Sequence, residues 1–180
     1  MNDMRFATLR KAMVDSQIRP NKVIDDQVIE AFSTVPRELF VNRQMQELAY
    51  IDEDLHLSGG RFIIEAMVMA RMVQALKLTP SDNVMCIGAG NGYGAAILSS
   101  LAASVIAIET RIQMVEKAQQ IVAGLDIGNV AVVKSRLQDG YPSEAPYQGI
   151  IIEGGVEYLP QALFDQLSDG GSLVCVLRPQ

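Results

Sequence analysis

Short apolar runs alternate with segments of helical periodicity through the second half of the chain. Apolar runs of strand length, bounded by turn residues, predict buried strands at 84–87, 105–108, 130–133, 147–152 and 173–177. Helical composition is found between them, at 93–101, 113–123 and 161–167. This alternation predicts an α/β fold with a doubly wound, mainly parallel sheet and right-handed crossovers. The expected strand order is 3-2-1-4-5, with a ligand at the carboxyl ends of the first and fourth strands.

The first 80 residues have helical periodicity without strand-like runs. Helices are expected at 4–16, at 26–35 behind a cap formed by Asp25 and Asp26, and at 63–78, with a short helical piece at 37–49. The polar segment 51–57 predicts extended chain, and residues 58–61 predict a loop before the helix 63–78. Turns are expected at 79–82 and at 169–171. We therefore expect one structural domain in two parts, a helical extension with a loop over 1–80 and the sheet over 81–180.

Three glycines, Gly88, Gly90 and Gly92, follow the first predicted strand at alternate positions. Glycine lets the backbone turn sharply and approach a ligand closely. The helix that begins next would direct free N–H groups and the positive end of its dipole into that turn. Glu109 ends the second predicted strand, 17 residues after Gly92. A carboxylate there suits a hydrogen bond to ribose hydroxyls, so the pattern predicts a nucleoside site.

The glycine turn fits two nucleoside classes. Residues 90–95 match the dinucleotide pattern G-x-G-x-x-A, and residues 88–92 match the looser G-x-G-x-G turn typical of S-adenosylmethionine enzymes. The helical lead-in and the absence of a Tyr-x-x-x-Lys pair for hydride chemistry favour the second class. A nicotinamide dehydrogenase, and a glycine turn that only packs a helix on the sheet, stay as alternatives.

Composition narrows the chemistry and the partners. No apolar run approaches the roughly 20 residues of a membrane span, and the N-terminus has no signal pattern, so we expect a cytoplasmic protein without a membrane partner. A net charge of −6 argues against nucleic acid. His56 is the single histidine, which leaves no basis for a metal site or a Ser-His-Asp triad. Cys86 and Cys175 fall in predicted strands that are not neighbours, and both are expected to be buried, reduced thiols.

Several motifs resemble those of the protein-L-isoaspartate O-methyltransferase family, in the same order along the chain. The family sequences are M-V-x-x-Q-I-R, V-P-R-E-x-F-V, L-A-Y-x-D, I-G-T-G-S-G-Y and L-x-P-G-G, and the matching residues here are 13–19, 35–41, 48–52, 87–93 and 167–171. The resemblance implies a Rossmann-like, S-adenosylmethionine-dependent methyltransferase. Its expected reaction is protein repair, in which the α-carboxyl of an isoaspartyl residue in a damaged protein or peptide is methylated.

The resemblance also implies which residues form the site. The cofactor would be bound by Ile87, Gly88, Ala89, Gly90, Gly92, Tyr93, Glu109, Thr110, Arg136 and Leu137. Its methionine portion would lie on the glycines, and Glu109 would hold its ribose. The acceptor loop would contribute Ser58, Gly60, Arg61, Phe62 and Ile64. No catalytic acid or base is expected, because a carboxylate is already a nucleophile at pH 7 and the enzyme needs only to align the reactants and exclude water.

The chain departs from the family pattern in the acceptor loop. The family loop G-x-G-Q-T-I-S-Q-P carries threonine and serine hydroxyls that face the substrate carboxylate, and Phe62 and Ile64 stand at those positions. Each lost charge-assisted bond costs roughly 1.5–3 kcal/mol. Glu65 adds a like charge, and Arg61 is a candidate replacement donor. A relative with another acceptor, and a non-catalytic binding module that kept the fold, are therefore the alternatives.

The cofactor side and the end of the chain depart as well. Cys86 replaces the acid that ends the first strand in the family, and residues 135–137 read Ser-Arg-Leu instead of G-D-G. Family members continue into an antiparallel pair of strands, whereas this sequence ends at Gln180 and leaves 173–177 as an apolar edge strand. We expect either a truncated sequence or an edge that pairs with another chain in an oligomer.

Overall fold

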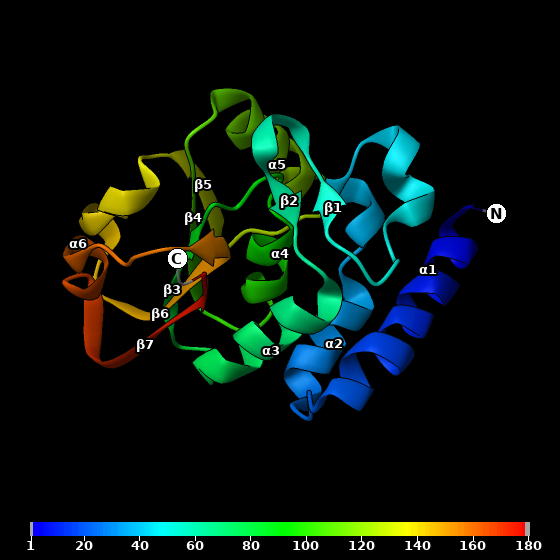
Figure 1. The fold of residues 1–180 in the computed structure, drawn as a ribbon, viewed down its shortest axis with the longest axis horizontal. Coiled ribbons are helices and arrows are strands. Elements are labelled where there is room, and N and C mark those ends of the chain that lie inside the picture. Colours follow the sequence, from blue (N-terminus) through cyan, green and yellow to red (C-terminus); the bar gives the residue numbers. More distant parts are fainter. Residues whose placement is uncertain (1, 179–180) are drawn as a thin grey trace.

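A parallel sheet of five strands forms the centre of the computed structural model, which describes residues 2–178 (Figure 1). The strands are β3 (Asn83–Ile87), β4 (Ser104–Glu109), β5 (Val130–Lys134), β6 (Tyr147–Val156) and β7 (Leu167–Leu177). Their order is β5-β4-β3-β6-β7, and every neighbouring pair is parallel. The predicted order 3-2-1-4-5 and the predicted parallel α/β fold are confirmed.

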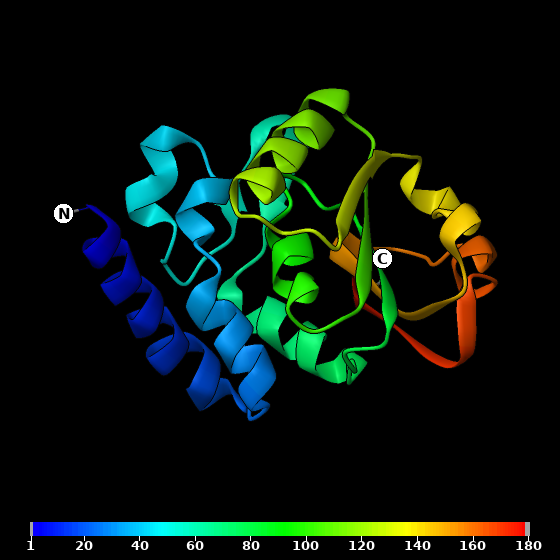
Figure 2. The same cartoon turned by 180° about the vertical axis from the view of Figure 1, so that it is seen from behind.

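Alternate residues of the strands face two different hydrophobic clusters. On one face, Cys86 and Ala107 belong to the larger cluster, to which α3 (Ala66–Leu76), α4 (Tyr93–Ser99) and α5 (Ile112–Gly124) contribute. On the other face, Met85 and Ile106 pack toward α6 (Gln161–Phe164) and nearby 3₁₀ turns. Figure 2 shows α5 against the sheet from behind. The sheet is thus wound on both faces, although its second face is covered by short elements.

The amino-terminal helices join the larger cluster. They are α1 (Asn2–Met13), a π-helix at Val14–Ile18, a 3₁₀ helix at Arg19–Asn21 and α2 (Asp26–Thr34). The predicted helix 4–16 was too short, because the chain stays helical to Asn21 by changing its hydrogen-bond spacing. The predicted cap of α2 is confirmed at Asp25, whose carboxylate accepts from the backbone N–H groups of Gln27 and Val28 at 2.9 and 3.2 Å.

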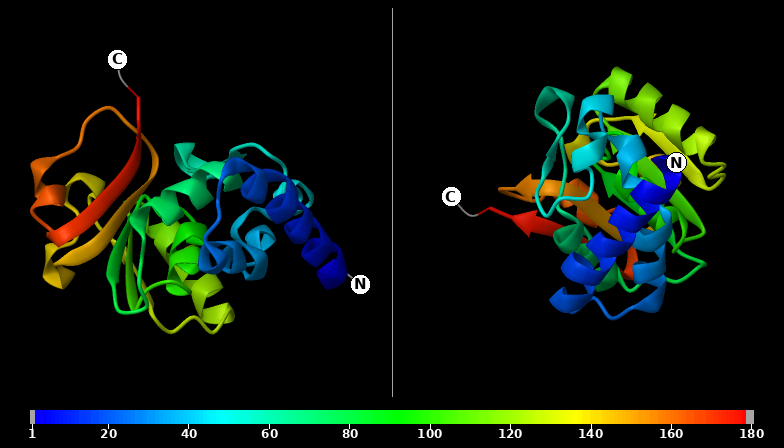
Figure 3. Two further views of the ribbon diagram at one scale, coloured as in Figure 1. Left: turned by 90° about the horizontal axis from the view of Figure 1, so that it is seen from below. Right: turned by 90° about the vertical axis from the view of Figure 1, so that its right-hand side faces the viewer.

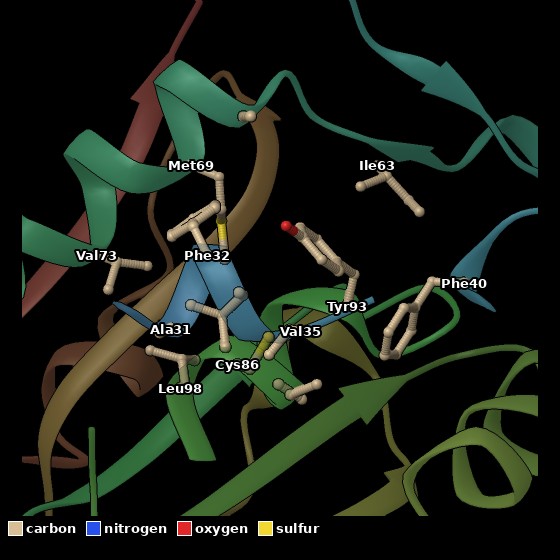
Figure 4. Packing of buried hydrophobic residues seen from close by; sticks show 14 of the residues in the cluster. Ala31, Phe32, Val35, Phe40, Ile63, Met69, Val73, Cys86, Tyr93 and Leu98 are labelled. Atoms are coloured by element: carbon tan, nitrogen blue, oxygen red, sulfur yellow. The ribbon is translucent and has the colours of Figure 1, made fainter. Parts of the chain in front are cut away.

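Aromatic side chains join these helices to the sheet. Phe32 of α2 and Phe40 meet the ring of Tyr93 edge to face, with centroid distances of 6.2 and 5.4 Å. Figure 4 shows Tyr93 between them, with Met69 of α3 nearby. The helical extension and the sheet therefore share one continuous core.

The segment between α2 and α3 was only partly predicted. Strand β1 (Leu55–His56) pairs antiparallel with β2 (Phe62–Ile63), and a 3₁₀ turn at Ser58–Gly60 joins them. The predicted helix 63–78 was wrong at its start, because this hairpin delays α3 until Ala66. The helical piece expected at 37–49 consists of two 3₁₀ helices, Arg37–Phe40 and Arg43–Leu48.

Strand β7 is longer than the apolar run that predicted it. It begins at Leu167, so the turn expected at 169–171 lies inside the strand as a shift of register against β6. Cys175 on this strand is only partly buried, so its predicted full burial was wrong, whereas Cys86 is buried; both are free thiols. Within residues 2–178, β7 pairs with β6 alone and forms an edge of the sheet, and α1 lies at the opposite end of the molecule (Figure 3).

Across the same described residues, no helix has the length and apolar character needed to span a bilayer.

Candidate functional site

The glycine turn after β3 lies at the carboxyl edge of the sheet. The backbone N–H groups of Gly88 and Ala89 donate to the carbonyl of Ile108 at 3.0 and 3.2 Å, which ties the turn to β4. Gly90 and Gly92 have φ angles of +55° and +94°. A Cβ at Gly90 would lie 3.1 Å from Leu57 of the hairpin. The turn therefore has the sharp conformation that the sequence predicted, and the β1–β2 hairpin lies against it.

Glu109 ends β4 beside this turn and is completely buried. Its Oε2 accepts from the N–H of Gly90 at 3.2 Å, and its Oε1 accepts from the N–H and the hydroxyl of Thr110 at 2.7 and 3.0 Å. Burial raises the pKa of Glu109, but the guanidinium of Arg61 and the bonds from Thr110 outweigh burial and hold the pKa below its ordinary value. Glu109 is thus an oriented carboxylate at the predicted ribose position.

Arg61 joins the acceptor loop to the predicted cofactor site. Its Nε donates to Glu109 Oε2 at 2.9 Å and its Nη2 donates to Oε1 at 3.1 Å, which is a bidentate ion pair. A Cβ at Gly59 would collide with the guanidinium of Arg111, so the hairpin tip also packs against the residue two positions after Glu109. The structure therefore brings together two sets of predicted residues that the sequence kept separate.

A cleft of about 890 Å³ opens between the hairpin, the start of α3 and the carboxyl ends of β6 and β7. The acceptor-loop candidates Gly60, Arg61, Phe62 and Ile64 line it, and Ser58 lies exposed at the hairpin tip outside the lining. The cleft is acidic, because its lining carboxylates are Asp52, Glu53, Asp54, Glu65 and Glu153. Burial and the neighbouring carboxylates Asp52 and Asp54 raise the pKa of Glu65.

A second cavity of about 380 Å³ lies beyond the glycine turn, near α6. Ile87 and Leu137, both predicted cofactor-binding residues, line it together with Ile152. Arg136 lies outside this lining and is exposed, with its guanidinium 3.5 Å from Asp139. Tyr93 is buried in the aromatic core, outside the linings of both cavities.

Glu153 is a site residue that the sequence reasoning missed. It follows the isoleucine run of β6, and the thiol of Cys86 on β3 donates to its Oε1 at 2.8 Å. Burial raises the pKa of Glu153 to about 7 and also raises that of Cys86. A usable signal existed, because Glu153 stands at the carboxyl end of the fourth predicted strand, where a ligand was expected.

Arg37 is a second residue without an assigned role in the sequence reasoning. It is completely buried, and its Nε and Nη2 donate to the carbonyls of Ala49 and Ile64 at 2.8 and 2.9 Å. Its guanidinium also lies 4.8 Å from the centroid of the Tyr93 ring. Arg37 thus fixes the base of the hairpin to α4 and holds Ile64 at the wall of the cleft.

Among the described residues, His, Cys, Asp and Glu side chains form no group of three or more that could hold a metal ion.

Comparison with known proteins identifies the family. Residues 8–179 match the model of the protein-L-isoaspartate(D-aspartate) O-methyltransferase family. The chain belongs to this family. It is 41% identical over 169 residues to protein-L-isoaspartate O-methyltransferase 1 of Rhodopseudomonas palustris, and the match covers 94% of this chain and 69% of that protein. The protein-L-isoaspartate O-methyltransferase of Methanoculleus marisnigri is 36% identical, with coverages of 95% and 78%.

Solved structures agree with the family assignment. A protein-L-isoaspartate O-methyltransferase superposes with a TM-score of 0.77 at 27% identity; the match covers 98% of this chain and 55% of the solved chain. This chain thus spans little more than half of that protein. A second solved structure is a Plasmodium falciparum protein provisionally assigned the same activity, in complex with S-adenosyl-L-homocysteine. It superposes with a TM-score of 0.79 at 20% identity, and the match covers 94% of this chain and 84% of that chain. At this identity, the likeness supports the fold alone.

Proposed function

We propose that this protein transfers a methyl group from S-adenosylmethionine to the α-carboxyl of isoaspartyl residues in damaged proteins or peptides. One observation carries the proposal. In a chain of this family, the glycine turn and the buried carboxylate of Glu109 lie at the carboxyl edge of the sheet, with an acceptor-sized cleft on one side and a smaller cavity on the other.

The residues present fit the cofactor. Gly90 and Gly92 have positive φ angles, which glycine adopts without strain, and they place no side chain on the turn. Glu109 is held in place by Gly90 and Thr110 for hydrogen bonds to ribose hydroxyls. Ile87 and Leu137 give the smaller cavity apolar walls, which suit the flat face of an adenine ring. Arg61 is an obstacle to the cofactor, because its guanidinium already occupies both oxygens of Glu109.

The chemistry asks little of the protein beyond alignment. The bound cofactor supplies an electrophilic methyl group on a sulfonium sulfur. An oxygen of the acceptor carboxylate forms a bond to that carbon as the carbon–sulfur bond breaks, and the bonding electron pair stays on sulfur. No proton moves, because the acceptor is already ionised at pH 7. The hairpin and the start of α3 contribute by holding the acceptor in line and by limiting water in the cleft.

The proposed reaction also indicates the partner and the cellular compartment of the protein. The acceptor is a protein or peptide, and the net charge of −6 disfavours a nucleic acid instead. The cytoplasm is our proposed location, and the two free cysteines accord with a reducing compartment. Pairing of β7 with a strand from a second copy would cover its exposed residues Val176 and Leu177, and this assembly stays a prediction.

The activity is tested with a pair of peptides that differ only in one linkage. A peptide containing isoaspartate and its normal aspartyl isomer are incubated with the protein and methyl-labelled S-adenosylmethionine. We expect label to appear as a base-labile ester in the isoaspartyl peptide alone. Binding of S-adenosylhomocysteine without methylation of either peptide would contradict this acceptor, and no binding at millimolar cofactor would leave only a binding module.

A second candidate is a methyltransferase with another acceptor. It is favoured by the apolar side chains of Phe62 and Ile64 in the lining of the cleft, together with the excess of carboxylates around them. An anionic acceptor gains less in such a surrounding than a neutral or cationic one. Label transferred to an unrelated protein mixture, but to neither peptide, would favour this candidate.

A further inference from the structure

Any carboxylate that enters the acceptor cleft needs a positively charged partner. Five carboxylates line the cleft, whereas the cations in its lining, within the described part of the chain, are Arg61 and Arg178. Phe62 and Ile64 offer no hydroxyl. A carboxylate acceptor in this field would be repelled unless a guanidinium bound it directly, since charge-assisted bidentate pairs are the strong ones.

Arg61 is the better placed of the two cations. It belongs to the hairpin that forms the wall of the cleft, and its side chain already reaches from that wall to Glu109. Arg178 lies at the other side, where its side chain packs near Gly155 at the end of β6. Arg61 is 27% exposed although Glu109 is fully buried, so the guanidinium can rotate while the carboxylate stays fixed.

Glu109 cannot serve Arg61 and a ribose together. Its Oε1 accepts from Arg61 Nη2 and from the N–H and hydroxyl of Thr110, and its Oε2 accepts from Arg61 Nε and the N–H of Gly90. These bonds fill the roughly four lone-pair sites of a carboxylate. Two of the donors are backbone N–H groups, and the hydroxyl of Thr110 reaches Oε1 alone. A ribose hydroxyl therefore gains Oε2 by displacing Arg61.

We propose that Arg61 exchanges partners when the cofactor binds. Before binding, it neutralises Glu109; ribose hydroxyls then take its place, and the freed guanidinium turns into the cleft and binds the acceptor carboxylate. Arg61 thereby takes over the work of the hydroxyls that are missing at positions 62 and 64. This second half rests on the proposed function. The exchange also sets an order, with cofactor before acceptor, because only the cofactor releases the guanidinium.

If Arg61 exchanges partners, replacing it should strengthen the binding of the cofactor product and weaken the binding of the acceptor. In Arg61→Ala, Glu109 is free in advance, so S-adenosylhomocysteine should bind about three- to tenfold more tightly in calorimetric titration. The same variant should raise KM for the isoaspartyl peptide by about tenfold or more, with a smaller change in kcat. Arg61→Lys keeps the charge but cannot form the bidentate pair of hydrogen bonds. Its S-adenosylhomocysteine affinity and its peptide KM should therefore lie between those of the wild type and Arg61→Ala.

Arg178→Ala is the matched control, because it removes the other cation of the cleft and leaves Glu109 untouched. Its affinity for S-adenosylhomocysteine should equal that of the wild type. If Arg61→Ala damaged the site in general, the binding of both S-adenosylhomocysteine and the peptide would weaken. The expected combination, tighter S-adenosylhomocysteine binding with a higher peptide KM, would not appear. Unchanged or weaker S-adenosylhomocysteine binding by Arg61→Ala overturns the exchange, and a rise of peptide KM confined to Arg178→Ala overturns the acceptor role.

Failure of the proposed function is a separate result. If the wild type methylates no isoaspartyl peptide, the titrations with S-adenosylhomocysteine still decide whether Arg61 and the ribose compete for Glu109. In that case, the acceptor role is judged by titrating the isoaspartyl peptide into the complexes of the wild type and Arg61→Ala with S-adenosylhomocysteine. Equal affinities for the peptide in the two complexes would overturn the acceptor role.

Discussion

Glu153, near the carboxyl end of β6, is partly buried between the thiol of Cys86 and the acidic cleft. Its pKa is raised from 4.5 to about 7, chiefly by burial. The folded state therefore prefers the protonated carboxyl more strongly than the unfolded chain does. The stability that this preference contributes is complete below pH 4.5 and is lost as the pH rises to about 7.

Glu153→Gln should consequently stabilise the protein in alkaline but not in acidic solution. The amide keeps the shape and still accepts the thiol hydrogen of Cys86, but it has no charge to desolvate. We expect a gain of about 1–3 kcal/mol at pH 8 and little change near pH 4.5, measured by denaturant unfolding. Glu116→Gln on exposed α5 surface is the control and should show no such pH dependence. A gain of equal size at both pH values would contradict the burial argument.

The individual residues of the site were predictable to different degrees. Gly88 and Glu109 stand directly after apolar runs, so local pattern alone located the turn and the strand end. The pairing of Arg61 with Glu109 joins residues 48 positions apart. It depends on where the hairpin packs, and that is a tertiary result with no signal in the local pattern.

The turn into α4 offers a prediction at the scale of the element. Gly92 precedes the first residue of α4 with φ +94°, and a Cβ there would lie 3.2 Å from the Cβ of Ala118 on α5. Gly92→Ala should destabilise the protein by about 1–3 kcal/mol in urea unfolding, because an L-residue is strained at this φ angle and α5 leaves little space. Gly128→Ala is the control, since a Cβ at Gly128 meets nothing within 4 Å. Equal effects of the two substitutions would refute the argument.

Elements with long, uniform patterns were predicted, and elements set by their surroundings were missed. The buried strands β3 and β4 coincide with predicted apolar runs within one residue, and β6 begins at its predicted run and continues to Val156. The hairpin was missed because β1 and β2 have two residues each and include polar His56. Its existence depends on packing over the glycine turn and on Arg37 at its base. The early start of β7 was hidden because Asp169, Gly170 and Gly171 resemble a turn.

At the scale of the whole molecule, the helical extension and the sheet are not separable layers. One continuous cluster contains Phe6 of α1, Phe32 of α2 and Cys86 and Ala107 of the sheet. Arg37 links the same parts through Ala49 and the ring of Tyr93. Elements that share a core in this way unfold together. The expectation of one structural domain with two sequence segments, 1–80 and 81–180, therefore becomes a prediction about cooperativity.

Phe32→Ala tests that cooperativity, because Phe32 is completely buried and joins α2 to Tyr93 of α4. The cavity should cost about 3–5 kcal/mol. In a single domain, this loss shifts the whole transition by roughly 10 °C, with coincident curves from far-ultraviolet circular dichroism and tyrosine fluorescence. Phe164→Ala is the matched control, since Phe164 is 42% exposed on α6 and should shift the transition far less. If the extension were a separate unit, Phe32→Ala would split the unfolding curve into two steps, and the step that reports the sheet would keep the midpoint of the wild type.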